Sequence, residues 1–95
     1  MSKPNKSQEM KSLRLLIDKI DNKILPLMVR RSKLVEKVLA LKSKKSEIVD
    51  KKRINQILKK IEKKSNKMKA DPRLLKSIWM SMIANFIEYE KKELK

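Results

Sequence analysis

Cysteine and histidine are both absent from this 95-residue sequence. Their absence excludes disulfide frameworks, metal sites built on thiolate or imidazole ligands, and catalysis by a Ser-His-Asp triad. No apolar run approaches the roughly 20 residues that span a bilayer, and residues 1–8 are polar. We therefore expect a cytoplasmic protein with no membrane segment, no metal and no cofactor.

Glycine is absent as well, and apolar and polar residues nowhere alternate over a sustained stretch. Tight hairpin turns favour glycine and half-buried strands need that alternation, so the sequence predicts an all-α protein. A chain of 95 residues forms one domain with a thin core, which favours oligomerisation. We predict a disordered tail over residues 1–8 and one helical domain over residues 9–95.

The sequence also has little aromatic content, with one Trp, one Tyr and one Phe. Its net charge of +16 is mostly lysine spread over polar helix faces, and proteins that bind single strands usually stack bases on aromatic rings. We therefore do not expect nucleic acid as a partner. Attraction to a small anionic molecule is the better interpretation of the charge.

A first helix is predicted from the Ser7–Ser12 region to about Lys42. Its apolar side chains recur every three or four residues and keep their phase across Pro26, which predicts a bent but continuous helix. The stripe holds Leu13, Ile17, Ile20, Ile24, Leu27, Leu34, Val38 and Leu41, with Arg31 among them. A guanidinium facing a core costs several kcal/mol unless an anion offsets its desolvation. Arg31 therefore predicts a bound anion.

Two further helices complete the predicted chain. The second begins near Asp50 and frays over residues 63–69, and the third begins at Asp71 and Pro72, because aspartate caps free amides and proline suits a first turn. The faces expected to be buried are Ile54, Ile57, Leu58, Ile61 and Met68, then Leu75, Ile78, Trp79, Met82, Ile83, Phe86 and Ile87. The last face continues in phase to Glu90. That residue is either a second charge on an apolar stripe or part of an exposed last turn.

The basic residues of the first helix make a prediction about assembly. Arg31 and Lys42 are eleven residues apart, so on one helix they share a face at about 16 Å, and a small dianion can lie between them. Arg14 lies about 25 Å before Arg31 and is rotated by roughly a quarter turn. It can join the same site only from a second subunit whose first helix packs antiparallel. We therefore predict a homodimer with two equivalent shared sites.

Residues Leu13 to Lys42 resemble the first helix of the all-helical (AroQ-type) chorismate mutases. The shared elements are LR, IDxID, RR and the trailing lysine at the expected spacings, and the likeness continues through Arg53 and Glu90. The resemblance implies a three-helix chain with a long first helix in an intertwined antiparallel homodimer. It also implies an isomerase that rearranges chorismate to prephenate in phenylalanine and tyrosine biosynthesis.

The resemblance also implies roles for five side chains. Arg14, Arg31 and Arg53 bind the substrate, with the first two holding its carboxylates as forked donors. Lys42 donates to the ether oxygen, where negative charge grows in the transition state. Glu90 meets the same oxygen, and since a glutamate donates only when protonated, we expect turnover to fall as pH rises. The rearrangement needs no nucleophile, metal or cofactor.

Two positions depart from the mutase pattern. Ile54 stands where most of these enzymes have a glutamate after the arginine, and Phe86 replaces a small polar residue. Both changes, and the short spacing from Lys42 to Arg53, are more like isochorismate-pyruvate lyase, a relative that makes salicylate and pyruvate. Glu90 argues against it, because the lyase resembles the glutamine form. The lyase is therefore the alternative, and a Lys-rich module that binds nucleic acid or protein is a third interpretation.

Overall fold

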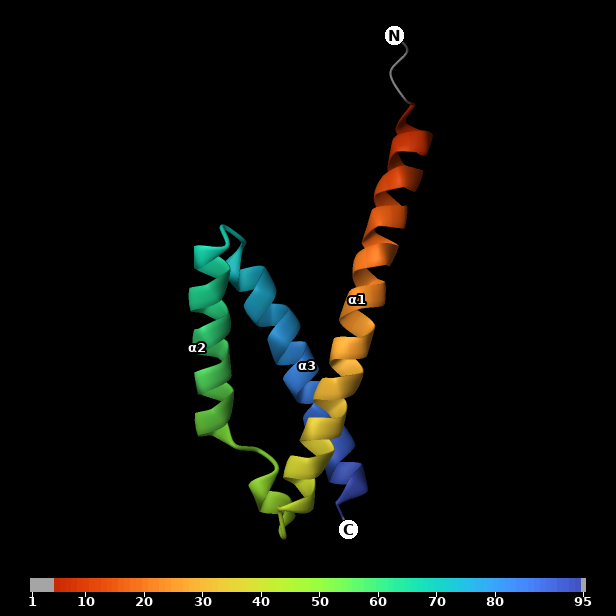
Figure 1. Cartoon of the computed structure of the whole chain (residues 1–95). Helices are drawn as coiled ribbons and strands as arrows, with labels where there is room; N and C mark the ends of the chain where they lie inside the picture. The colour runs from red at the N-terminus through yellow and green to blue at the C-terminus, as the bar shows by residue number, and fades with distance from the viewer. Residues whose placement is uncertain (1–4, 95) are drawn as a thin grey trace. The chain divides into compact units, whose positions relative to one another are not determined.

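The computed structural model describes residues 5–94 of the chain. They form the helices α1 (Lys6–Ala40), α2 (Lys51–Lys67) and α3 (Pro72–Glu93), with the short 3-10 helix η1 (Lys45–Glu47) between α1 and α2 (Figure 1). No strand occurs in this part of the chain. Within residues 5–94, no helix is long and apolar enough to cross a membrane. The predicted all-α class, with three helices and a long first one, is confirmed.

Helix α1 is continuous through Pro26 for 35 residues, as the apolar phase predicted. It begins at Lys6, where the Gln8 amide donates to Asn5 Oδ1 at 2.8 Å. Residues 6–8 of the predicted tail are therefore helical, and residues 1–4 lie outside the described part of the chain. The helix ends two residues before Lys42, whose amide closes a tighter turn onto the Leu39 carbonyl at 2.9 Å.

The start signal predicted for the third helix is confirmed, and the second helix, predicted to begin near Asp50, starts with a cap of the same kind. Asp50 lies just before α2, and its carboxylate accepts from the Arg53 amide at 3.0 Å. Asp71 does the same for α3 by accepting from the Arg73 amide at 2.9 Å, with Pro72 in the first turn. These caps satisfy amides that have no partner inside the helix.

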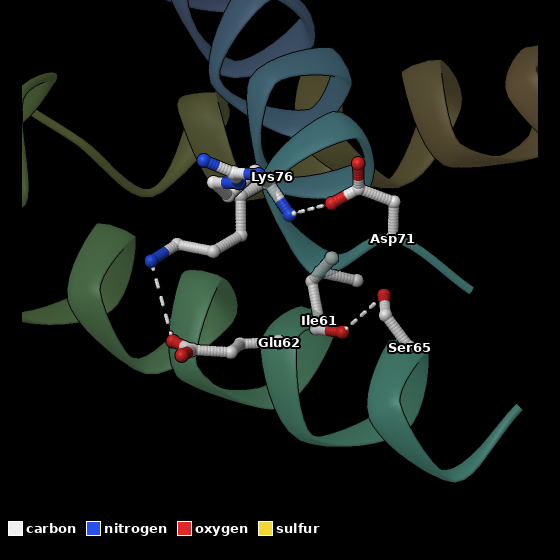
Figure 2. A network of polar contacts seen from close by, with 6 residues as sticks. Ile61, Glu62, Ser65, Asp71 and Lys76 are labelled. Atoms are coloured by element: carbon white, nitrogen blue, oxygen red, sulfur yellow. Dashed lines mark hydrogen bonds and ion pairs between the residues drawn. The ribbon is translucent and has the colours of Figure 1, made fainter. Parts of the chain in front are cut away.

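The predicted fraying over residues 63–69 is wrong, because α2 continues to Lys67. Its end has the hydrogen bonds of a Schellman motif: the Ala70 amide donates to the Ser65 carbonyl at 2.9 Å, and Lys69 adopts a left-handed φ of 59°. Glycine usually occupies that position, but this chain has none. Ser65 anchors the last turns because it is buried and its hydroxyl donates to the Ile61 carbonyl at 2.6 Å (Figure 2).

The chain divides into two compact units, one ending at Leu34 and the other beginning at Val35. In the second unit α2 packs against α3, and the buried residues are Leu39, Ile48, Ser65, Ile83 and Glu90. The predicted inner faces of α2 and α3 supply the half-buried residues Ile54, Ile57, Leu58, Ile61, Leu75, Trp79, Met82, Phe86 and Ile87. The second unit therefore has a small core of its own.

Two residues predicted for that core are not in it. Met68 is 78% exposed, because it lies at the C-cap where the chain turns toward α3. Ile78 is also exposed. Ser65, a polar residue that the apolar pattern omits, is buried instead because its hydroxyl bonds to the backbone of its own helix.

The first unit is a single helical segment with no buried residue among those described. Every residue from Asn5 to Leu27 is exposed, including the predicted apolar stripe. The burial predicted for that stripe is therefore not achieved within one chain. Water-exposed apolar stripes of this length are typical of helices that pack against another chain.

Candidate functional site

The second unit places Lys42 against Glu90. Lys42 Nζ donates to Glu90 Oε1 at 3.3 Å, and the two side chains are only 17% and 7% exposed. Lys42 follows the end of α1, and Glu90 lies in the last turns of α3. The possibility that Glu90 lies in an exposed last turn is therefore wrong. Charges withdrawn from water in this way interact more strongly with a nearby ligand than exposed charges do.

Buried apolar residues fix the backbone on both sides of Lys42. Leu39 and Ile48 flank it in sequence, and both are buried. The Lys42 amide donates to the Leu39 carbonyl, and the Ser43 hydroxyl donates to Glu47 Oε1 at 3.1 Å within the loop that follows. A long, flexible lysine side chain is thus carried on an ordered segment, which lowers the entropy cost of aiming its ammonium group.

An open hollow lies beside Lys42 in the second unit. Its other lining residues are Glu47, Val49, Asp50 and Lys51, which belong to the loop before α2 and to its first turn. Arg53 is exposed in the same first turn of α2, and its amide donates to the Asp50 cap. Lys42 and the start of α2 therefore border the same open space.

Arg14 and Arg31 lie on α1 in the first unit. Arg14 is exposed and Arg31 is half-buried. Because α1 is one continuous helix, the seventeen residues between them correspond to about 25 Å along its axis. One copy of the chain therefore cannot bring these two guanidinium groups to the same small molecule. Among the five predicted side chains, Lys42 and Glu90 are in direct contact.

The two positions that depart from the mutase pattern are both half-buried. Ile54 lies on the inner face of α2, and Phe86 lies on α3 one turn before Glu90. Each apolar side chain therefore has a packing role in the second unit. Among residues 5–94, no group of three or more acidic side chains could hold a metal ion.

A contact that the sequence did not predict joins Tyr89 to Glu36. The Tyr89 hydroxyl donates to Glu36 Oε1 at 2.8 Å, between residues 53 positions apart. This hydrogen bond raises the pKa of Tyr89, with smaller contributions from desolvation and from the charges of Glu36 and Glu93. No sequence pattern signals such a pair, because both residues lie on polar faces and meet only after α3 has packed.

Comparison with known protein families shows a match over most of the chain. The family model described as chorismate mutase type II matches residues 13–91. Among curated proteins and among solved structures, none matches the chain. The matched region contains all five predicted site residues, from Arg14 to Glu90.

Proposed function

We propose, since the chain belongs to the chorismate mutase type II family, that it rearranges chorismate to prephenate. The observation that carries this proposal is the family match over residues 13–91, which includes the buried contact between Lys42 and Glu90. The product serves phenylalanine and tyrosine biosynthesis, which supports a cytoplasmic location. Residues 9–95 would act as one catalytic domain.

The reaction sets what the protein has to provide. The rearrangement breaks a carbon–oxygen bond and forms a carbon–carbon bond within one molecule, so no group attacks the substrate and no proton is transferred. Catalysis then depends on holding the compact conformer and on stabilising charge at the ether oxygen. Arg14 and Arg31 would hold the two carboxylates as forked donors, and Arg53 would add positive charge at the start of α2.

Lys42 is the donor best placed for the ether oxygen. Its ammonium group has three N–H donors. One donates a hydrogen bond to Glu90, and the others remain available to a ligand in the open hollow. The Glu90 carboxylate holds the ammonium in place while burial keeps water from competing. A donor of this kind contributes about 3 kcal/mol of transition-state stabilisation.

Glu90 would have a second role when it is protonated. An ionised carboxylate only accepts hydrogen bonds, so in that form Glu90 orients Lys42 and cannot itself donate to the substrate. The protonated form offers a second donor to the ether oxygen. Glu90→Gln is informative about both roles, because its amide can accept from Lys42 and also donate to the ether oxygen.

The proposed active unit is an intertwined antiparallel homodimer. The exposed apolar stripe of the first unit supports it, because burying each large aliphatic side chain contributes about 1.5–3 kcal/mol. The spacing of the arginines supports it independently, since only a second copy can bring Arg14 to the site that holds Arg31. Two-fold symmetry then gives two sites, each completed by Arg14 of the other subunit.

Isochorismate-pyruvate lyase is the second candidate, and the apolar residues Ile54 and Phe86 favour it. Their half-buried positions in the second unit weaken that argument, because packing alone accounts for an apolar side chain there. The third interpretation, a Lys-rich binding module, rests on the net charge of +16. Binding to nucleic acid would weaken steeply with added salt, whereas a buried dianion site would lose much less.

The test is to supply chorismate and isochorismate separately to the purified protein and to identify the products by chromatography. Prephenate from chorismate is the expected result. Salicylate and pyruvate from isochorismate, with little prephenate, would establish the lyase. If neither substrate is consumed, the proposal is wrong and the binding module is favoured. Arg31→Ala is the matched control, because it should abolish turnover and leave the helical circular dichroism unchanged.

A further inference from the structure

Two consecutive residues near the end of α3 both reach back to the end of α1. Tyr89 donates its hydroxyl proton to Glu36 at 2.8 Å, and Glu90 accepts from Lys42 at 3.3 Å. All four residues belong to the second unit. The Lys42–Glu90 contact is buried, whereas the Tyr89–Glu36 contact is exposed and would not itself touch a substrate.

We propose that the Tyr89–Glu36 hydrogen bond is a positioning clasp that holds Glu90 and Lys42 in the geometry needed for turnover. The inference rests on the proposed function, because the effect is expressed through the donor at the ether oxygen. Tyr89 and Glu36 are positioning residues and not catalytic ones.

The need for a clasp follows from where Glu90 lies. Glu90 is three residues before the end of α3, and the last turns of helices fray when nothing ties them down. A single contact between Lys42 and Glu90 allows the helix end to rotate about it. Side chains of consecutive helical residues point about 100° apart, so a second contact from Tyr89 stops that rotation. Glu36, six residues before Lys42, anchors this second contact on α1 itself.

The clasp has the properties of a durable contact. A phenol that donates to a carboxylate forms a charge-assisted bond, which is shorter and stronger than a neutral one. The same bond raises the pKa of Tyr89, so the phenol keeps its proton throughout the neutral range where an enzyme assay is run. Tyrosine also has only two side-chain torsions, so little entropy is lost in holding it.

The chain offers a matched control in the Lys76–Glu62 ion pair, which joins α3 to α2 (Figure 2). Lys76 Nζ lies 3.2 Å from Glu62 Oε2, and both side chains are exposed. Lys76 is fourteen residues before Glu90 on α3, which places it about 21 Å away along the axis. Removing this pair loosens the second unit without disturbing the end of α3 near Glu90.

The experiment compares Tyr89→Phe, Glu36→Ala and Glu36→Gln with Glu62→Ala in the full chain. Tyr89→Phe and Glu36→Ala should each lower kcat by about three- to tenfold, because donor misplacement affects the transition state, with KM changed by less than about twofold. The double variant should be no slower than either single one. Glu36→Gln should keep most of the rate, since its amide oxygen still accepts. Glu62→Ala removes the acceptor of Lys76 and should leave kcat unchanged.

Several outcomes would overturn the clasp. One is a Tyr89→Phe protein that keeps the unaltered kcat, and another is a Glu62→Ala protein that loses as much kcat as Tyr89→Phe does. Additive losses from Tyr89→Phe and Glu36→Ala would also contradict it. Thermal melts of all variants separate misfolding from misplacement, because a purely structural contact would lower the midpoint and not kcat. If the unaltered protein does not turn over chorismate, the proposed function fails and the clasp fails with it.

Discussion

The two units of the chain differ in whether their apolar residues are buried. In the unit that begins at Val35, α2 and α3 pack against each other, and Leu39, Ile48 and Ile83 are buried. In the unit that ends at Leu34, no described residue is buried, and the apolar side chains of α1 face water. A helix gains little stability from its own hydrogen bonds and depends mostly on the packing of its apolar face. The second unit therefore has a small core, whereas the first unit needs a partner surface.

The predicted site is divided along the same line. Lys42, Arg53 and Glu90 lie in the unit with a core, where a buried contact already holds two of them. Arg14 and Arg31 lie in the unit without one. The proposed shared site would therefore combine residues of the second unit in one copy with an arginine of the first unit in another.

The greatest loss of activity should come from removing Lys42, the proposed hydrogen-bond donor of the second unit. Lys42→Ala should lower kcat/KM by about 100- to 1,000-fold, because transition-state charge at the ether oxygen loses its partner. Lys44→Ala, an exposed lysine two residues on, is the control and should stay within about twofold. Steady-state kinetics with chorismate measure both. Lys42→Ala also leaves the buried Glu90 carboxylate without its cation, which can destabilise the fold. The double variant Lys42→Ala/Glu90→Gln removes that buried charge, so it should unfold at a higher temperature than Lys42→Ala and still be inactive.

The next effect tests the unit without a core. Ile20 is 56% exposed in one chain, and Ile20→Lys should cost about 2–5 kcal/mol of dimer stability if a second copy buries it. Asn22→Lys adds the same charge on the opposite side of α1 and should cost less than about 0.5 kcal/mol. Sedimentation equilibrium and urea unfolding give both numbers. Equal behaviour of the two variants would mean that the stripe is not an interface.

A smaller effect concerns the hydrogen bonds that Glu90 can make. Glu90→Gln keeps an oxygen that accepts from Lys42 and adds an amide that can donate to the ether oxygen, whereas Glu90→Ala keeps neither. Glu90→Ala should therefore lower kcat by about tenfold more than Glu90→Gln does, as measured by steady-state kinetics with chorismate. Equal rates for the two variants would show that no hydrogen bond of Glu90 contributes to turnover.

The smallest effect is confined to alkaline solution. Tyr89 is the only tyrosine, so the ultraviolet absorbance of tyrosinate reports its titration alone. Its pKa is raised above the ordinary value of about 10 by the hydrogen bond to Glu36. The clasp therefore adds its full stability below the pKa of the unfolded chain and loses it as pH rises through the higher folded pKa. Glu36→Ala should move the titration back to lower pH, and an unchanged midpoint would mean that no such bond forms in solution.

The starts of α2 and α3 were more predictable than the end of α2. Asp50 and Asp71 are the N-caps of α2 and α3, and their capping hydrogen bonds need no tertiary contact. The end of α2 was missed because Lys69 occupies a left-handed position where glycine is the usual signal. Ser65 was missed because a hydroxyl that bonds to its own helix can be buried, which apolar periodicity does not count.

The candidate site was predictable only where a charge interrupted a pattern. Glu90 continues the apolar face of α3, which allowed either a buried charge or an exposed last turn, and the structure buries it against Lys42. Tyr89 and Glu36 interrupt nothing, so their contact emerges only from the packed structure. The apolar stripe of α1 was predicted to be buried. Periodicity indicates that such a face packs against another surface, but it does not say whether that surface belongs to the same chain or to a second copy.

Each active site is proposed to take residues from two copies of the chain. A mixture of two variants that are inactive on their own is the sharpest test of this sharing. Arg14→Ala and Lys42→Ala are unfolded together in equal amounts, refolded and assayed with chorismate. Half of the dimers are then mixed, and one of the two sites in each has neither substitution. We expect about a quarter of the unaltered activity. Activity no greater than the average of the two separate variants would contradict a shared site.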